Sequence, residues 1–173
     1  MASVDGTDFD IMEQVPFYSG WWSKKMNGTA LRYEIAIAIK TGYIVWLLGP
    51  YPAGSYSDIK IFRSHLKHLL MMKPGERVEA DQGYRGERKY VDTKDDMIDS
   101  LARRDMKNLV RSRHETVNGR LTQFSILNDR FRFNIKKHRH VMASVCVIVQ
   151  IQFENGHPPW QITDSEYSTY HFG

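Results

Sequence analysis

The chain has 173 residues, of which 42% are hydrophobic and 25% charged, and its net charge is +4. This is an ordinary globular composition, sufficient for one domain with a core of its own. A single cysteine, Cys146, excludes a disulfide framework within the chain, so we expect a reducing compartment and a buried, inert thiol. The longest apolar run is shorter than the roughly 20 residues that a membrane span needs, so no membrane partner is expected.

The first half of the chain has the patterns of β-strands. Asp5–Ile11 is plausible as a strand, and Leu31–Lys40 alternates apolar and polar residues with a period of two. The dipeptide Thr41-Gly42 then predicts a tight turn into a second apolar run, Tyr43–Leu48. We therefore expect these two runs to form an antiparallel hairpin.

A helix and a short strand are predicted next. After a loop rich in Gly, Pro and Ser, either Ser57 or Asp58 can cap a helix. The apolar residues that recur at helical spacing are Ile59, Phe62, Leu66, Leu69 and Leu70. The run Arg77–Ala80 has strand character and stops at Asp81, which is followed at once by a glycine-rich, cationic turn.

The second half is predicted to be mainly helical. His114–Phe131 and Lys136–Phe153 read as helices, with a strand as the alternative for the second, whereas Glu87–Arg104 has no clear pattern. The predicted order is three strands, a helix, a strand and further helices. This order indicates a mixed α/β fold, a sheet flanked by helices, and it is compatible with an RNase H-like core. We assign 1–155 to one domain and 156–173 to a polar C-terminal tail.

Three acids occur where carboxylates could meet. Asp5 lies on the first predicted strand, Asp81 ends a later strand, and Glu115 begins a predicted helix, offset from its apolar stripe. Converging carboxylates suit hard divalent cations, and a pair of Mg²⁺ or Mn²⁺ ions can cleave a phosphodiester. The alternative is that Asp81 caps a turn and that Asp5 is a surface acid.

Positive charge is concentrated in one segment. Residues 103–140 contain 11 Lys and Arg and only three acids, which favours a polyanionic partner, with a solvated cationic surface as the alternative. Trp21 and Trp22, followed by Lys24 and Lys25, either stack on unpaired bases or pack in the core. The candidate DNA-binding residues are Arg85, Arg111, Arg113, Arg120, Arg130, Arg132, Lys136 and Lys137.

Four segments, in order, resemble the Harbinger-type DDE transposases, the DDE superfamily endonucleases. They are VDGTDFDI, GPYPAGSYSDIKIFR, EADQGYRGE and RHETVNGRLTQFSILNDRFR. The resemblance implies an RNase H-like fold and divalent-metal cleavage or transfer of DNA strands. It implies Asp5, Asp81 and Glu115 as the catalytic, metal-holding acids, with 33 residues between the last two. Asp58 matches a further family Asp, as a supporting acid or, in preference, a helix cap.

The resemblance also sets expectations beyond the site. It implies a nuclear location and a separate Myb-like protein that binds DNA. Family proteins usually carry a helical region before the first Asp, so this chain is N-terminally truncated relative to the family and its first strand is expected to pair poorly. Asp8 and Asp10 are rivals for the first position, but alternation puts them opposite Asp5 and the Asp-Gly-Thr match favours Asp5.

These observations predict a metal-dependent DNA nuclease or transposase domain. The first alternative is an inactive, domesticated or truncated copy that binds DNA or protein. A second alternative is a nuclease of the same fold that acts on RNA. The target sequence and the oligomeric state are left open.

Overall fold

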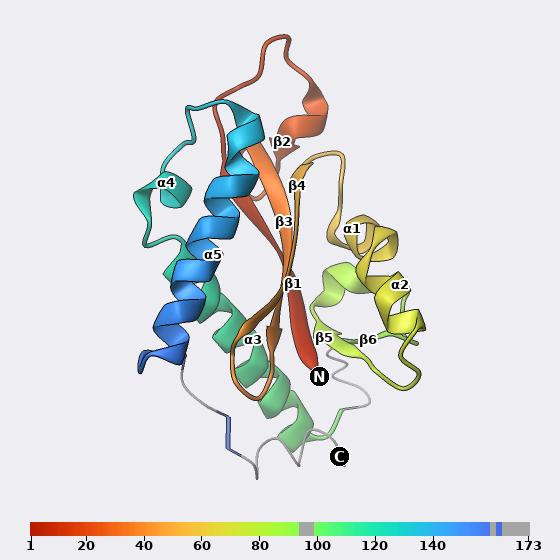
Figure 1. Ribbon diagram of the computed structural model, residues 1–173. Coiled ribbons are helices and arrows are strands. Elements are labelled where there is room, and N and C mark those ends of the chain that lie inside the picture. The colour runs from red at the N-terminus through yellow and green to blue at the C-terminus, as the bar shows by residue number, and fades with distance from the viewer. Residues whose placement is uncertain (94–98, 160–161, 164–173) are drawn as a thin grey trace.

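The computed structural model describes residues 1–93, 99–159 and 162–163 and shows a mixed α/β fold (Figure 1). Among these residues, six strands form one sheet. Its path runs β2-β3-β1-β5-β6, and β4 pairs with β3. The strands are β1 (Ala2–Asp10), β2 (Trp22–Ser23), β3 (Gly28–Ala38), β4 (Ile44–Pro52), β5 (Val78–Ala80) and β6 (Val91–Thr93).

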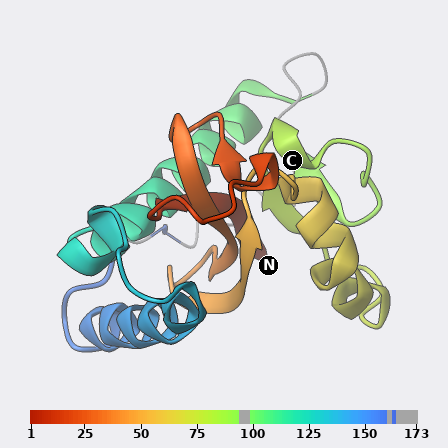
Figure 2. The same cartoon turned by 90° about the horizontal axis from the view of Figure 1, so that it is seen from above.

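Helices cover both faces of this sheet (Figure 2). The α-helices are α1 (Asp58–Ser64), α2 (Leu66–Met71), α3 (Leu101–Leu121), α4 (Ser125–Asn128) and α5 (His138–Glu154). Short 3₁₀ turns are η1 (Ser19–Trp21), η2 (Gln82–Tyr84) and η3 (Ile135–Lys137). In the part of the chain that the structure describes, no helix has the length and apolar character needed to cross a membrane.

Strand β1 lies in the middle of the sheet. It pairs antiparallel with β3 from Ala2 to Asp10 and parallel with β5 at Ala2–Val4. The expectation that the first strand pairs poorly is therefore wrong. A long antiparallel partner on one side and a short parallel partner on the other supply hydrogen bonds to its backbone groups.

The two faces of the sheet are buried by different helices. Alternate residues of β3, including Tyr33 and Ile35, share the larger core with apolar residues of α3 and α5. The opposite face carries Val4 and packs on α1, α2 and η2 through Phe62 and Tyr84. Figure 1 shows these two layers, with α3 and α5 on one side of the sheet and α1 and α2 on the other.

The predicted hairpin is confirmed, because β3 and β4 pair antiparallel across the turn. The predicted helix after Ser57 is divided into α1 and α2 at His65, whose backbone leaves the helical region. The helix predicted to begin at His114 begins instead at Leu101 and ends at Leu121. Its first half has little apolar periodicity, because the charged Lys107 occupies a buried position there.

The C-terminal helix α5 matches its prediction closely in extent, but it is not buried on all sides. One face, including Met142 and Val149, enters the larger core, whereas Val147 and Ile151 are exposed. Cys146 is buried on this helix as predicted, and burial raises the pKa of its thiol to about 12.

Candidate active site

The sheet brings Asp5 and Asp81 to adjacent strands. Val4 of β1 is paired in parallel register with Ala80 of β5, and the two acids are the next residue on each chain. Neighbouring strands lie about 4.8 Å apart, so the two Cα atoms are close. Figure 1 shows β5 beside β1 near the middle of the molecule.

Each of these two acids is oriented by a glycine amide. The Gly83 N–H donates to Asp81 Oδ1 at 2.7 Å, which caps the 3₁₀ turn η2, and the Gly6 N–H donates to Asp5 Oδ1 at 2.8 Å. Asp81 does therefore cap a turn, as the alternative interpretation proposed. A cap made by one carboxylate oxygen is compatible with a further ligand on the other oxygen.

A third carboxylate, that of Asp58, lies near Gly6 and Gly83. Asp58 is the first residue of α1, and the N-cap position before it belongs to Ser57. The preferred expectation that Asp58 is the helix cap is therefore wrong. Its carboxylate instead occupies the space beside Gly6 and also approaches Gly83, where an added Cβ would lie 3.2 Å from Asp58 Oδ2 and 2.9 Å from Asp81 Oδ1.

The pKa values of Asp5 and Asp58 are both raised. Burial raises the pKa of Asp5 from 3.8 to about 6, and the charges of Asp81 and Asp58 add to this increase. Burial likewise raises the pKa of Asp58, where Asp81 and Asp8 add and Arg32 opposes. An excess of negative charge at a half-buried site is the condition that a bound cation relieves.

Lys25 supplies positive charge to this site. It is the largest opposing charge for Asp5 and also acts on Asp58. The turn that carries it is anchored by Ser23, whose hydroxyl donates to Asp8 Oδ2 at 2.6 Å and accepts from the Met26 N–H at 3.1 Å. The sequence places Lys25 beside Trp22, but only the fold brings it to the acids.

Glu115 lies on α3 and is directed mainly to solvent. Its side chain is 69% exposed and its carboxylate is 3.7 Å from the Arg111 guanidinium, one helical turn earlier. The residue before it, His114, is buried and its Nδ1 is 3.2 Å from the Ser3 hydroxyl, so this part of α3 packs against β1. Within residues 1–93, 99–159 and 162–163, no three acids, histidines or cysteines are grouped closely enough to hold a metal ion.

The rival aspartates of β1 have other partners. Asp8 accepts two bonds from Arg32, at 2.6 and 2.8 Å, and its side chain is fully buried. Asp10 lies 3.2 Å from the Arg130 guanidinium. Of the three aspartates of this strand, Asp5 is the one that lies beside Asp81.

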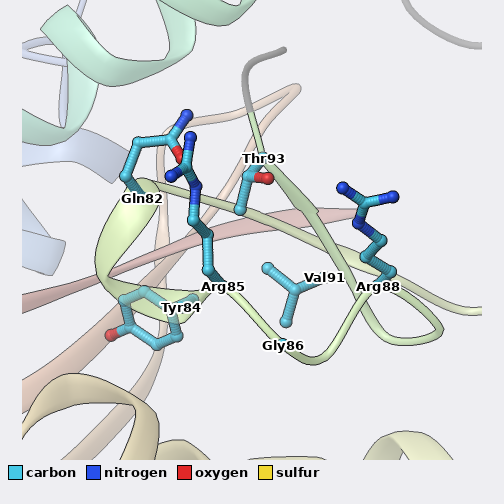
Figure 3. A pocket seen from close by; sticks show the side chains of 7 residues that line it. All are labelled: Gln82, Tyr84, Arg85, Gly86, Arg88, Val91 and Thr93. Carbon is cyan, nitrogen blue, oxygen red and sulfur yellow. The ribbon is translucent and has the colours of Figure 1, made fainter.

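A polar cavity of about 340 Å³ lies directly after Asp81, in the loop between η2 and β6 (Figure 3). The side chains of Gln82, Arg85 and Arg88 extend from this loop, whereas the Tyr84 ring points to its other side. Tyr84 is fully buried and packs edge-on against Phe62. No acidic partner of Arg85 or Arg88 is found among the described residues, so both guanidinium groups are available to an anion.

The cations of the basic segment, residues 103–140, are less available to a ligand than the sequence suggests. Lys107 is buried between Asp92 and Asp99, with its Nζ 2.9 Å from a carboxylate oxygen of each. Arg113 is fully buried and donates to the carbonyl groups of Ile39 and Lys40. The prediction that Arg113 binds DNA is therefore wrong, because its side chain does not reach the surface.

The other predicted DNA-binding residues have solvent access. Arg111 pairs with Glu115, Arg130 pairs with Asp10, and Arg120 is half-buried near the end of α3. The remaining three, which follow α4, are exposed and have no acidic partner in the described part of the chain. They are Arg132, Lys136 and Lys137.

The sequence of residues 4–150 matches the family model of the DDE superfamily endonucleases. The chain belongs to this family. No curated protein and no solved structure matches it. The family confirms the resemblance seen in the four sequence motifs, and it indicates a nuclease or transposase domain that acts on DNA and, as these domains generally do, with divalent metal ions.

Proposed function

We propose that this domain is a divalent-metal-dependent DNA endonuclease or transposase with an RNase H-like sheet. The observation that carries the proposal is the pair Asp5 and Asp81, placed side by side by the parallel pairing of β1 and β5. The strand path, in which β4, β3 and β1 are antiparallel and β5 and β6 add in parallel, supports the RNase H-like comparison.

The chemistry of the two neighbouring acids suits the implied ion. Mg²⁺ and Mn²⁺ prefer carboxylate oxygens, and the raised pKa of Asp5 indicates a local excess of negative charge. Asp5 and Asp81 would hold the ion, with Glu115 of α3 as the third acid. When bound, such ions activate a water or a DNA 3′-hydroxyl and stabilise the leaving oxygen of the phosphodiester.

The residues around the acids would bind and orient the DNA strand. Lys25 supplies positive charge to Asp5, and Arg85 and Arg88 line the cavity that follows Asp81 in the chain. Guanidinium groups bind phosphate oxygens through paired hydrogen bonds, and the ammonium of Lys25 adds a point charge. The DNA backbone would cross the acids between these cations, and a Myb-like partner and a nuclear location complete the proposal.

Plasmid nicking tests this function. Wild type should convert supercoiled plasmid to open circles with Mg²⁺ or Mn²⁺, and EDTA should prevent it. Asp81→Asn should reduce the rate at least a hundredfold while leaving the unfolding transition in place, and Glu115→Gln should do the same. The matched control, Asp105→Asn, removes an exposed acid from α3 and should nick at the wild-type rate. Full nicking by the Asp81 variant would refute the assignment.

The second candidate function is an inactive module that binds DNA or protein. The exposed position of Glu115 and its pairing with Arg111 favour it, because the third acid has a cation partner of its own on α3. This candidate predicts salt-sensitive DNA binding without metal-dependent nicking. Matched DNA and RNA duplexes as substrates would identify a ribonuclease.

A further inference from the structure

The segment between α4 and α5 exposes an aromatic ring to solvent (Figure 1). Phe133 is 66% exposed, and its ring packs edge-to-face against that of the buried Phe131, with the ring centroids 5.5 Å apart. The two rings line a surface groove of about 690 Å³ together with Ile126, Arg130 and Arg132. Phe133 is therefore supported by a core residue and still largely open to a ligand.

Hydrogen bonds hold the backbone on both sides of this ring. The Phe131 N–H donates to the Asp10 carbonyl at 3.0 Å, and the Phe131 carbonyl accepts from the Met12 N–H at 2.9 Å, so this residue is joined to the end of β1. On the other side, the Asn134 side chain accepts from the Lys136 N–H at 3.0 Å and begins η3. A ring carried by so short a segment between two anchors loses little freedom when a ligand binds to it.

Positive charge surrounds the ring. Residues 129–137 contain four Lys and Arg and a single acid, Asp129. Three of the cations, Arg132, Lys136 and Lys137, are exposed without an acidic partner in the part of the chain that the structure describes, and the fourth pairs with an acid of β1. An open apolar ring among unpaired cations is complementary to a polyanion that also carries apolar faces.

We propose that this surface is a subsite for single-stranded DNA, in which an unpaired base stacks on Phe133 while Arg132, Lys136 and Lys137 bind neighbouring phosphates. Every base has a flat face, and stacking on an aromatic side chain beside backbone cations binds a strand with little preference for its sequence. In a duplex only the base edges and the phosphates are open to a protein. The ring therefore distinguishes an unpaired strand from a paired one.

The subsite is separate from the acids of the candidate active site. Asp10, to which its segment is joined, lies five residues after Asp5 on β1, about 17 Å along the strand. The subsite thus goes beyond the proposed nuclease activity and needs no metal ion. Its consequence for cleavage rests on the proposed function: a nuclease with this subsite favours DNA that has an unpaired stretch over fully paired DNA.

Fluorescence anisotropy of a short labelled DNA strand, alone and annealed to its complement, tests the proposal in EDTA. Phe133→Ala should weaken binding of the single strand about tenfold, because one base–aromatic stack is lost, and should leave binding of the duplex unchanged. Phe133→Trp should keep the single-strand affinity, whereas Phe133→Leu, which is apolar but has no ring, should lose as much as Phe133→Ala.

A second exposed phenylalanine provides the matched control. Phe17 is 55% exposed, but residues 12–23 around it contain no Lys or Arg. Phe17→Ala should therefore bind the single strand as wild type does. If Phe133 had only a packing role, Phe133→Ala would lower the melting temperature at unchanged single-strand affinity, and that result would overturn the proposal.

The salt dependence of binding tests the cations. Lys136→Gln should lower the slope of log affinity against log salt concentration by about 0.7 for the single strand, because one phosphate contact is lost. Arg132→Gln should do the same. The control is Lys73→Gln, which removes a 72% exposed cation just after α2, on the other side of the sheet, and should keep the wild-type slope.

The outcomes separate this inference from the proposed function. Unchanged single-strand affinity in Phe133→Ala or Phe133→Leu overturns the inference, and so does equal displacement of the strand by poly-glutamate of the same charge, which would indicate an acidic protein segment as the occupant. If such a protein still nicks plasmid DNA, the proposed function stands. Single-strand binding that depends on Phe133 without any metal-dependent nicking supports the inference and overturns the nuclease activity.

Discussion

Glu34 offers a direct test of the electrostatics behind the candidate site. It lies on β3 opposite Gly6, its side chain is fully buried, and one carboxylate oxygen accepts from the Trp46 indole at 3.0 Å. The other oxygen is buried without a hydrogen-bond partner. Burial raises its pKa from 4.5 to about 8, so the folded protein keeps this acid protonated at neutral pH.

The sign and size of the effect of pH on the free energy of unfolding follow from these pKa values. Above pH 4.5 the unfolded chain releases the Glu34 proton, whereas the folded protein keeps it until about pH 8. The unfolded state therefore binds fewer protons, and the free energy of unfolding falls as the pH rises, by about 1.4 kcal/mol for each pH unit. Over the whole interval from 4.5 to about 8 the loss is about 5 kcal/mol.

Glu34→Gln should remove this loss, because the amide stays neutral and still accepts from Trp46. Urea unfolding of wild type and Glu34→Gln, from pH 5 to pH 8.5 in EDTA, would measure it. The variant should be close to wild type at pH 5 and several kcal/mol more stable at pH 8. The exposed Glu76→Gln is the control and should follow wild type throughout. A difference between wild type and Glu34→Gln that does not change with pH would refute the reasoning.

Two further predictions concern groups outside the site. Lys107→Met should destabilise the protein by about 1–3 kcal/mol in urea unfolding, because Asp92 and Asp99 lose their buried cation and keep only Arg103. No measurable loss would contradict the structure. Iodoacetamide should not modify Cys146 at pH 8 in the native state and should do so in urea, because the buried thiol has a pKa of about 12. Equal labelling rates in both states would show that the thiol is accessible.

The sequence predicted the sheet well where one physical rule decides the structure. The alternation in Leu31–Lys40 predicted β3, and the Thr41-Gly42 turn predicted its hairpin with β4. The short strand that ends at Asp81 was also predicted, from the strand character of Arg77–Ala80. These are local patterns, which a single sequence carries directly. The pairing of β1 with β5, which makes Asp5 and Asp81 neighbours, is a long-range contact that only the fold shows.

The polar side of the sheet could not be predicted in the same way. Arg32 and Glu34 alternate with apolar residues and therefore predict a solvent-facing side, yet helices α1 and α2 cover it and Glu34 is fully buried. The partners that make this burial possible, Asp8, Asp58 and Trp46, are distant in the chain or have no distinguishing pattern.

The start of helix α3 was predicted wrongly for a related reason. Helix α3 has charged residues at buried positions, and these are satisfied by acids and carbonyl groups from other elements. Lys107 and Arg113 therefore read as surface cations in the sequence. Charge counting along a chain measures composition, and only the fold shows which charges are already neutralised.

The order of the strands has a consequence for the chain during its synthesis. Asp5 leaves the ribosome before β5 and Asp81, which follow only after β3, β4, α1 and α2 have been made. A nascent chain that has not yet reached Asp81 therefore cannot bring the two carboxylates together, because they come from strands that pair only after this long crossover.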